Sequence, residues 1–363
     1  MNRKSLRLAA LPVAAMLFLG VAACGGDDDS GADSGAAEVS GNLAGSGSSA
    51  QGAAMQAWVA GFSEKYPDAT VNYDPTGSGA GRKAFTSGGV QFAGSDAYLK
   101  PEEVEAAKST CGGDFIEVPG YISPIAVAYN LEGVEGLKLS ASVIAKIFDG
   151  KITTWNDPAI TQLNAGVNLP ATKITTVHRS DESGTTENFT DYLAQAAKQD
   201  WPHEADGNWP VQGGEAAQGT QGVAAALRGG QGTIGYLDAS QAGDLGVASV
   251  QVGEEFVEYS PEAAAKVVDA ATRVEGRGDY SYAIDLPRDT TEAGVYPIVL
   301  VSYQLACVQY DSKQNADLVK AFLTYLVSEE GQKKAAENAG SAPITAKQRE
   351  NATKAIEAIK SAA

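Results

Sequence analysis

Apolar residues along the chain recur with helical spacing in some segments and with strand spacing in others. Met55, Trp58, Val59, Phe62 and Tyr66 follow the three- and four-residue intervals of an amphipathic helix. Further helices are predicted from Pro101, over Ser140–Gly150, around Phe189, from Pro261 and over Leu318–Leu326. Strands are predicted at Val71–Tyr73, Ile174–Val177, Thr233–Tyr236 and Ile298–Val301. This alternation of strands and helices predicts an α/β fold.

Local signals predict where two of these helices begin or end. Pro101 suits the first turn of a helix, where no backbone N–H is needed for an intrahelical bond. Ser140 can cap the helix that carries Val143 and Ile147, and Gly150 is expected to end it.

The first 24 residues have the pattern of a secretory signal. Arg3, Lys4 and Arg7 precede an apolar run that is short for a membrane-spanning helix. The run ends in Val21-Ala22-Ala23-Cys24, which resembles the lipobox of bacterial lipoproteins. That resemblance implies cleavage before Cys24, a diacylglycerol group on its sulfur and an anchor on the outer face of the cell membrane. The alternative is plain secretion. Residues 25–40, rich in Gly, Asp, Ser and Ala, are expected to form a flexible tether.

Length and charge narrow the class of protein. The 363 residues are enough for two domains. The formal net charge is −18, and loss of residues 1–23 would remove three basic residues and no acidic one, giving −21. Such a charge argues against nucleic acid as a partner, because no basic surface would replace counterions. It does not exclude an anionic ligand, since local N–H and O–H donors govern a buried pocket.

Two cysteines, Cys111 and Cys307, remain beside Cys24. Outside the cell they could pair, and their wide separation in the sequence does not prevent it. We therefore expect a disulfide between them.

Four short segments rich in Gly and small residues lie between the predicted strands and helices. They are Leu43–Ala50, Gly77–Gly81, Phe92–Asp96 and Arg179–Thr185. Three of them have the form of strand-to-helix turns, where unpaired N–H groups and a partial positive charge favour anions. Glycine permits close approach, and Ser and Thr add O–H donors. With the planar fork of donors on Arg179, these turns predict a site for a tetrahedral oxyanion. Each turn alone would also suit an ordinary helix cap.

Asp96 bears on which oxyanion would bind. A carboxylate can accept a hydrogen bond from a protonated oxyanion, whereas it repels one that has lost all its protons. Phosphate keeps a proton near neutral pH and sulfate does not, so Asp96 predicts a preference for phosphate. Sulfate or molybdate is the rival ligand. In the alternative interpretation, Asp96 caps the helix that begins at Pro101 or lies in a surface turn.

The order and local sequences of these segments resemble the periplasmic phosphate-binding proteins of the high-affinity phosphate ABC transporter. The resemblance extends to Gly150–Pro158 and Gly232–Tyr236 and covers about residues 41–345. It implies two α/β domains joined by two crossover strands, with a hinge and a ligand cleft between the domains. It also implies a monomer that delivers phosphate to membrane permease subunits and needs no cofactor.

The expected crossover strands are Tyr121–Tyr129 and Val299–Ala306. They would divide the body into domain I, residues 41–120 plus 303–363, and domain II, residues 121–302. The first three glycine-rich segments would then lie on domain I and Arg179–Thr185 on domain II. A ligand between them would bridge both domains and favour closure.

Matching by motif, the resemblance implies phosphate-binding roles for Ser49, Ala50, Ser78, Asp96, Arg179, Ser183, Gly184 and Thr185. Asp181 is expected to pair with Arg179 and hold its guanidinium in place. The family carries Thr-Phe where this chain has Ser49-Ala50. A backbone N–H survives that change, but the large side chain beside the ligand does not.

Two other classes of function fit the sequence less well. Gly45–Ala50 matches a loose dinucleotide-binding pattern, but Glu64, about 20 residues later, falls in a predicted helix rather than after a second strand. A phosphatase needs metal ligands or an activated nucleophile. The chain has only His178 and His203, without metal-ligand spacing, and no Gly-x-Ser-x-Gly elbow. We therefore expect a binding protein and not an enzyme, with no metal ion.

Overall fold

The computed structural model describes residues 39–362. The signal segment 1–23, Cys24 and nearly all of the tether lie outside these residues. Within the described part, no helix has the length and apolar content needed to cross a bilayer. Most of its buried apolar side chains belong to one continuous hydrophobic cluster.

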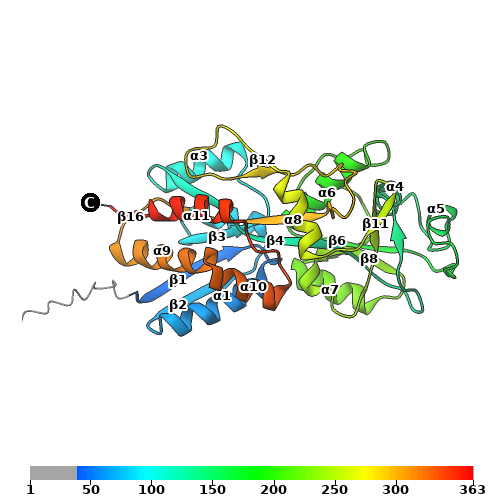
Figure 1. The fold of residues 1–363 in the computed structure, drawn as a ribbon, viewed down its shortest axis with the longest axis horizontal. Helices are drawn as coiled ribbons and strands as arrows, with labels where there is room; N and C mark the ends of the chain where they lie inside the picture. Colours follow the sequence, from blue (N-terminus) through cyan, green and yellow to red (C-terminus); the bar gives the residue numbers. More distant parts are fainter. Residues whose placement is uncertain (1–38, 363) are drawn as a thin grey trace, which may run out of the picture. The chain divides into compact units, whose positions relative to one another are not determined.

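A nine-stranded sheet runs through the structure in the order β2-β1-β3-β14-β4-β8-β6-β7, with β9 paired to β4 (Figure 1). We call the part built on β1, β2 and β3 the first lobe, and the part built on β6, β7 and β8 the second lobe. The strands are β1 (Gly41–Gly47), β2 (Ala69–Asp74), β3 (Phe92–Ser95), β4 (Phe115–Asn130), β6 (Thr175–Arg179), β7 (Glu215–Ala217), β8 (Thr233–Asp238), β9 (Gly246–Val247) and β14 (Val299–Cys307).

Two long strands, β4 and β14, join the lobes. β4 has 16 residues, all buried except Asn130, which suits a strand covered on both faces. Its first part, Phe115–Pro124, pairs with β14, and its last part, Ile125–Asn130, pairs with β8. The other edge of β14 pairs with β3. The expected crossovers fall within these two strands, while the residue bounds of two separate domains stay a prediction.

Helices cover both lobes. Between β1 and β4 lie α1 (Gly52–Lys65), α2 (Ser78–Thr86) and α3 (Pro101–Thr110). Between β4 and β14 lie α4 (Ala141–Phe148), α5 (Pro158–Thr161), α6 (Gly184–Ala196), α7 (Gly219–Gly229), α8 (Pro261–Asp269) and the short 3₁₀ helix η1 (Ala239–Gln241). After β14 the chain returns to the first lobe as α9 (Lys313–Val327), α10 (Glu329–Ala339) and α11 (Ala346–Glu357) (Figure 1).

The helix signals read from the sequence are confirmed. α3 begins at Pro101, and Ser140 caps α4 by accepting a hydrogen bond from the N–H of Val143. Just beyond the end of α4, Gly150 has a φ of +71°, a left-handed conformation that glycine adopts without strain.

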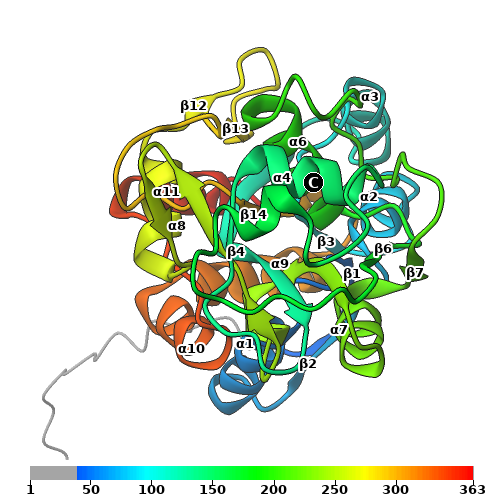
Figure 2. The same cartoon turned by 90° about the vertical axis from the view of Figure 1, so that its right-hand side faces the viewer.

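Smaller sheets lie outside the main one. β5 (Lys138–Leu139), β10 (Ser249–Val252) and β11 (Glu255–Val257) form a three-stranded sheet. β15 (Gln309–Tyr310) pairs with β16 (Lys360–Ser361). β12 (Thr272–Arg273) pairs with β13 (Ile284–Asp285) on the side of α3 and α6 (Figures 1 and 2).

The segment around β12 and β13 is held by two buried arginines. Arg277 donates to both carboxylate oxygens of Glu117 and to the carbonyl of Leu99, in the first lobe. Arg288 donates to the side chain of Asn188 on α6, in the second lobe. The segment therefore makes polar contacts with both lobes beside the two crossover strands.

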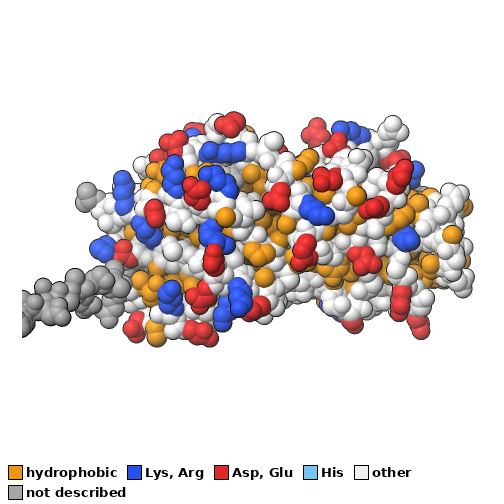
Figure 3. Space-filling view, in the orientation of Figure 1, with side chains coloured by type: hydrophobic (Ala, Val, Ile, Leu, Met, Phe, Trp, Pro, Cys, Tyr) orange, Lys and Arg blue, Asp and Glu red, His pale blue; other side chains and the backbone are white. Residues whose placement is uncertain are grey.

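Acidic and basic side chains are interspersed on the face of the described residues shown in Figure 3. That face carries no continuous basic surface of the kind that nucleic acids require.

A disulfide joins Cys111, at the end of α3, to Cys307, the last residue of β14. The two Cα atoms are 5.2 Å apart, although 196 positions separate the residues in the sequence. The bond therefore fastens the end of one crossover strand to the segment that leads into the other.

Replacing both cysteines with serine should lower the free energy of unfolding by about 2–5 kcal/mol, because the unfolded chain regains the freedom of a long closed loop. Urea titration of the oxidised wild type and the double variant measures the difference. Wild type treated with reductant is the control and should unfold like the variant. Equal midpoints for the oxidised wild type and the variant would contradict the expectation.

Candidate functional site

Loops from both lobes meet beside the crossover strands. Residues 48–50 follow β1, Ser78 opens α2, and Asp96 follows β3. Arg179 ends β6, and the loop after it leads into α6. β1 runs parallel to β2 and β3, so the first-lobe loops leave the same edge of the sheet, where α/β proteins commonly bind ligands. Through β14, β4 and β8, β6 runs in the opposite direction, so the loop after Arg179 points back toward them.

Asp96 is bonded to both lobes and to β14. The residue is 3% exposed. Its Oδ1 accepts a hydrogen bond from Ser302 at 2.5 Å, and its Oδ2 accepts one from Thr185 at 3.3 Å. Its backbone N–H donates to Ser78 Oγ at 3.1 Å, and its carbonyl accepts from Asn188 at 2.7 Å. Asp96 is therefore a buried junction and not a surface turn residue.

The surroundings of the Asp96 carboxyl act on its pKa in opposite directions. Burial raises that pKa above its ordinary value. Hydrogen bonds from Ser302, Ser48 and Thr185, together with the charge of Arg179, act to lower it. The ionised carboxyl can only accept hydrogen bonds, whereas the protonated form can also donate one. Its protonation state therefore decides which anions it attracts or repels.

Arg179 is held as the sequence predicted. Its Nε donates to Asp181 Oδ1 at 2.8 Å, and its Nη2 donates to Asp181 Oδ2. Asp181 also accepts the backbone N–H of Gly219, at the start of α7. Burial alone would raise the pKa of Asp181, but the bonds and charge of Arg179 leave it below its ordinary value. Arg179 is 3% exposed, and its bonds to Asp181 fix the orientation of the guanidinium.

The N-terminus of α6 adds backbone donors. Ser183 caps the helix by accepting the N–H of Thr186 at 3.2 Å, and its backbone carbonyl accepts the N–H of Glu187. Within the described residues, the N–H groups of Gly184 and Thr185 have no protein acceptor. These two groups and the partial positive charge of the helix end can serve a bound anion.

The lobes approach each other closely at glycines. A Cβ placed on Gly184 would lie 2.6 Å from the Cβ of Asp96 and 2.9 Å from Ser78 Oγ. The N–H of Gly79 donates to the carbonyl of Glu182 at 3.1 Å, across the lobes. Arg82, which is fully buried, also donates to Glu182 at 2.8 Å. The structure therefore has its lobes closed on each other.

Ser49 and Ala50 are placed apart from the Asp96 carboxyl contacts. Ser49 Oγ accepts the backbone N–H of Thr220 at 3.0 Å and lies 3.2 Å from the hydroxyl of Thr220. The N–H of Ala50 donates to Ser48 Oγ at 3.1 Å. Ser48, and not Ser49, contributes to the pKa of Asp96. The structure thus brings Ser78, Asp96 and Thr185 together but directs the hydroxyl of Ser49 to α7.

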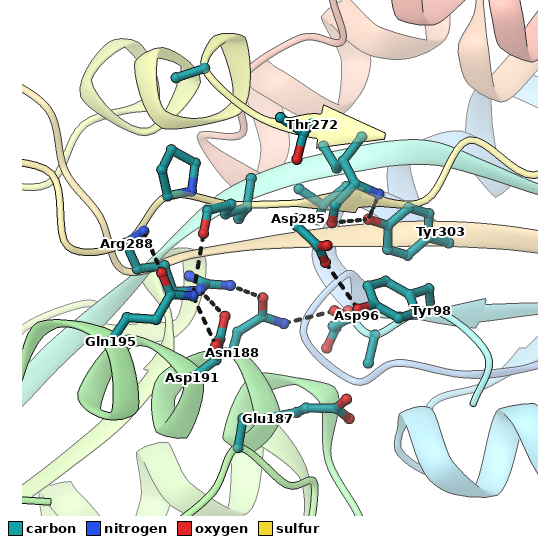
Figure 4. A pocket seen from close by; sticks show the side chains of 17 residues that line it. Asp96, Tyr98, Glu187, Asn188, Asp191, Gln195, Thr272, Asp285, Arg288 and Tyr303 are labelled. Atoms are coloured by element: carbon teal, nitrogen blue, oxygen red, sulfur yellow. Dashed lines mark hydrogen bonds and ion pairs between the residues drawn. The ribbon is translucent and has the colours of Figure 1, made fainter. Parts of the chain in front are cut away.

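A polar cavity of about 620 Å³ adjoins Asp96 (Figure 4). α6 lines one side with Glu187, Asn188 and Asp191, and the opposite side includes Asp285 and Arg288. Burial raises the pKa of Glu187 to about 7. With several carboxyl groups in its lining, the cavity itself is a poor site for an anion, which leaves the loop donors of Ser78, Arg179 and α6 to bind one.

Both histidines have other protein groups as partners. His178 stacks on Trp209 with ring centroids 5.2 Å apart, and its Nε2 lies 3.1 Å from the carbonyl oxygen of Gly213. His203 pairs with Asp149 at 3.1 Å. Among the residues that the structure describes, no three His, Cys, Asp or Glu side chains are grouped so that they could hold a metal ion.

Comparison with known proteins decides the family. A profile of the PBP superfamily domain matches residues 32–330. The phosphate-binding protein PstS 3 of Mycobacterium leprae is 39% identical over 291 residues, which is 77% of each chain. PstS 3 of Mycobacterium tuberculosis is 38% identical over 334 residues, which is 87% of this chain and 89% of that one. The chain belongs to the PstS family of phosphate-binding proteins.

Solved structures share the fold expected of a PstS protein. A phosphate-binding protein from Stenotrophomonas maltophilia superposes with a TM-score of 0.67 at 22% identity, covering 86% of this chain and 93% of that chain. A DING protein gives a TM-score of 0.70 at 21% identity, covering 85% and 93%. At such identities the likeness concerns the fold, and it confirms the two-domain binding-protein architecture.

Several residues at this PstS site were not predicted from the sequence. Ser302 and Asn188 bond directly to Asp96, and Thr220 bonds to Ser49. Ser302 lies within an apolar strand, where a serine gives no local signal of its partner. Asn188 lies one helical turn after Gly184 and faces the same side of α6, which could have placed it near the loops.

Gly184→Ala should weaken binding of an anion between the lobes by about ten- to hundredfold, as expected for overpacking that costs about 1–3 kcal/mol. The added methyl group would collide with Asp96 and Ser78 only while the lobes are closed. Isothermal titration with phosphate and urea unfolding of the free protein separate the two effects.

Gly222→Ala is a matched control for this substitution. It also adds a methyl group to a helix of the second lobe, but the nearest heavy atom would be 3.6 Å away, an ordinary contact. This variant should bind like wild type. Equal affinities for the Gly184 variant and the control would show that the close approach has no part in binding.

Proposed function

We propose that this protein binds inorganic phosphate between its two lobes and delivers it to an ABC importer, without chemical turnover. The observation that carries the proposal is the placement of one buried carboxyl, Asp96, among anion donors. Those donors are Ser78, the Arg179 guanidinium and the start of α6 at Gly184 and Thr185. The names and sequences of the PstS relatives support the same ligand.

The mixture of one acceptor with many donors favours a protonated oxyanion. Phosphate near neutral pH can donate an O–H to Asp96 while its other oxygens accept hydrogen bonds from the loops. Sulfate has no proton to donate, so it would face the ionised carboxylate oxygen to oxygen. That repulsion in a buried site favours phosphate over sulfate.

Closure follows from the division of these groups between the lobes. Ser78 and Asp96 belong to loops of the first lobe, whereas Arg179 and the start of α6 belong to the second. An anion that bonds to both sets stabilises the closed arrangement and not an open one. We assign domain I to residues 41–120 plus 303–363 and domain II to residues 121–302, with β4 and β14 as the hinge strands.

The same proposal includes the location of the protein. The lipobox resemblance at Cys24 supports a lipid anchor on the outer face of the cell membrane, with residues 25–40 as the tether. A tethered monomer beside the permease subunits can then meet phosphate outside the cell. The resemblance implies that the Ser49 hydroxyl and the Ala50 N–H complete the proposed site. In this closed structure they bond to Thr220 and to Ser48 Oγ, so they would have to leave these partners to reach a ligand.

Asp96→Asn should lower the ratio of phosphate affinity to sulfate affinity by about tenfold or more, because the amide presents no negative charge to sulfate. Calorimetric titration of the mature protein with each anion measures the ratio. Asp149→Asn is the control, since Asp149 pairs with Lys151 and His203 and is not among the groups that act on Asp96. Unchanged selectivity of Asp96→Asn would remove its assigned role.

Arg179→Ala should weaken phosphate binding by about ten- to hundredfold, the loss expected for a charge-assisted hydrogen bond. The control is Arg228→Ala, because Arg228 pairs with the exposed Asp244 away from the loops. Calorimetry gives the affinities, and a malachite green assay with a phosphate ester tests for turnover. Hydrolysis of the ester by the purified protein would favour a phosphatase instead.

A further inference from the structure

Ser302 is the closest polar partner of the Asp96 carboxyl that comes from a crossover strand. The residue is completely buried, and its hydroxyl donates to Asp96 Oδ1 at 2.5 Å. Ser302 lies on β14, 206 positions from Asp96 in the sequence, and not in the loops that carry the proposed donors. Its hydroxyl carries a single proton, which this bond uses.

An irregularity in the sheet sets the position of Ser302. The pairing of β14 with β4 shifts register between Ser302 and Tyr303, so that Ser302 pairs with Tyr121 and Tyr303 pairs with Pro119. On its other edge, β14 begins to pair with β3 at Tyr303, opposite Ser95. Register shifts of this kind re-aim side chains and are frequent beside functional sites. Ser302 therefore lies where β14 passes the end of β3, beside Asp96.

We propose that Ser302 is a positioning residue that keeps Asp96 oriented and ionised as a hydrogen-bond acceptor, and thereby sets the preference for a protonated oxyanion. The proposal rests on the proposed function. By donating to Oδ1, Ser302 fixes the plane of the carboxyl and stabilises its negative charge. Oδ2, toward Thr185 and the second lobe, keeps lone pairs with which to accept a proton-bearing ligand oxygen.

Ser302 is one of several groups around Asp96 that act on the pKa of its carboxyl, and its influence differs from theirs. Burial raises the pKa of the Asp96 carboxyl, and the Ser302 hydroxyl is the foremost influence acting to lower it, ahead of Ser48, Arg179 and Thr185. The other titratable groups that interact with Asp96 or share its cavity are Tyr73, Tyr98, Tyr121, Glu187, Asp191, Asp238, Asp285, Arg288 and Tyr303. A change at Ser302 removes none of these side chains.

Removal of the hydroxyl changes the site in a defined direction. Without Ser302 as a donor, the pKa of Asp96 rises further, and more of the carboxyl is protonated at a given pH. A protonated Asp96 no longer repels sulfate and can donate to it. Phosphate preference, which is lost as the pH falls through the pKa of Asp96 in the complex, should therefore be lost at a higher pH in Ser302→Ala.

The test is a set of phosphate and sulfate titrations at several values between about pH 5 and pH 9, where carboxyl groups with raised pKa values change charge. Ser302→Ala should lower the phosphate-to-sulfate affinity ratio by about ten- to hundredfold, as expected for a hydrogen bond to a charged group. It should also move the midpoint of lost preference to higher pH. Ser302→Thr retains the hydroxyl and should restore both the ratio and the midpoint.

Ser123→Ala is the control for loss of a buried serine from the same pair of strands. Ser123 is fully buried on β4, and its hydroxyl contacts the carbonyl of Pro124 and the side chains of Asp238 and Tyr121, but it does not bond to the Asp96 carboxyl. This variant should keep the wild-type ratio and midpoint. If Ser302→Ala does not fold, Ser302→Cys, which has a similar size and a weaker donor, replaces it and should give an intermediate shift.

The outcomes separate this inference from the proposed function. Wild type that binds no phosphate would overturn the proposed function and the inference with it. Wild type that prefers phosphate, with Ser302→Ala unchanged in ratio and midpoint, would overturn the inference alone. Equal losses in Ser302→Ala and Ser123→Ala, or a folded Ser302→Thr that behaves like Ser302→Ala, would also overturn it, because either result indicates a packing effect.

Discussion

The Asp96 carboxyl is buried away from water, yet the proposed site needs it to carry a negative charge. The surrounding structure depends on the groups that stabilise this buried charge. Burial of an isolated carboxylate is costly unless hydrogen bonds and opposite charge offset it. Here the offset comes from four separate parts of the chain, which are β14 through Ser302, the loop after β1 through Ser48, β6 through Arg179, and α6 through Thr185. None of these parts alone would stabilise the charge, so the position of Asp96 couples the sheet to both lobes.

The second lobe presents positive charge at the site, which a bound anion can balance. Asp181 fixes the guanidinium of Arg179 and is itself fixed by an N–H at the start of α7. The N–H groups of Gly184 and Thr185 at the start of α6, which have no acceptor within residues 39–362, add further donors on this lobe. A ligand that carries both negative oxygens and a proton matches the two lobes at once, because the acceptor Asp96 lies on the first lobe, whereas Arg179 and the start of α6 donate from the second.

Local sequence signals predicted much of the fold, since they depend on nearby residues. Pro101 and Ser140 mark helix starts through backbone chemistry that neighbours alone decide. The pairing of Arg179 with Asp181, two residues on, is likewise local, and the structure contains it as expected. The two crossover strands were implied by the family resemblance, and the strand-like runs Tyr121–Tyr129 and Val299–Ala306 matched them.

Contacts between distant segments could not be predicted in the same way. Ser302 lies in an apolar strand, and its partner is set by a register shift that no local pattern announces. Ser49 and Ser48 are adjacent hydroxyl residues, so a difference of one position in a turn decides which one approaches Asp96 and which one meets Thr220. In such a case, matching by motif can identify the loop that approaches Asp96, but it cannot predict the orientation of each side chain in that loop.

The disulfide between Cys111 and Cys307 has a consequence for how the molecule comes apart. The whole second lobe lies between these two cysteines in the sequence, so it is an insertion whose two stems are covalently fastened at their base. If the second lobe unfolds while the first remains folded, the second lobe becomes a loop closed by the disulfide, and both of its ends stay attached to the folded first lobe. Such a closed loop has fewer conformations than a linear chain and keeps β4 and β14 near each other, which favours recovery of the second lobe after partial denaturation.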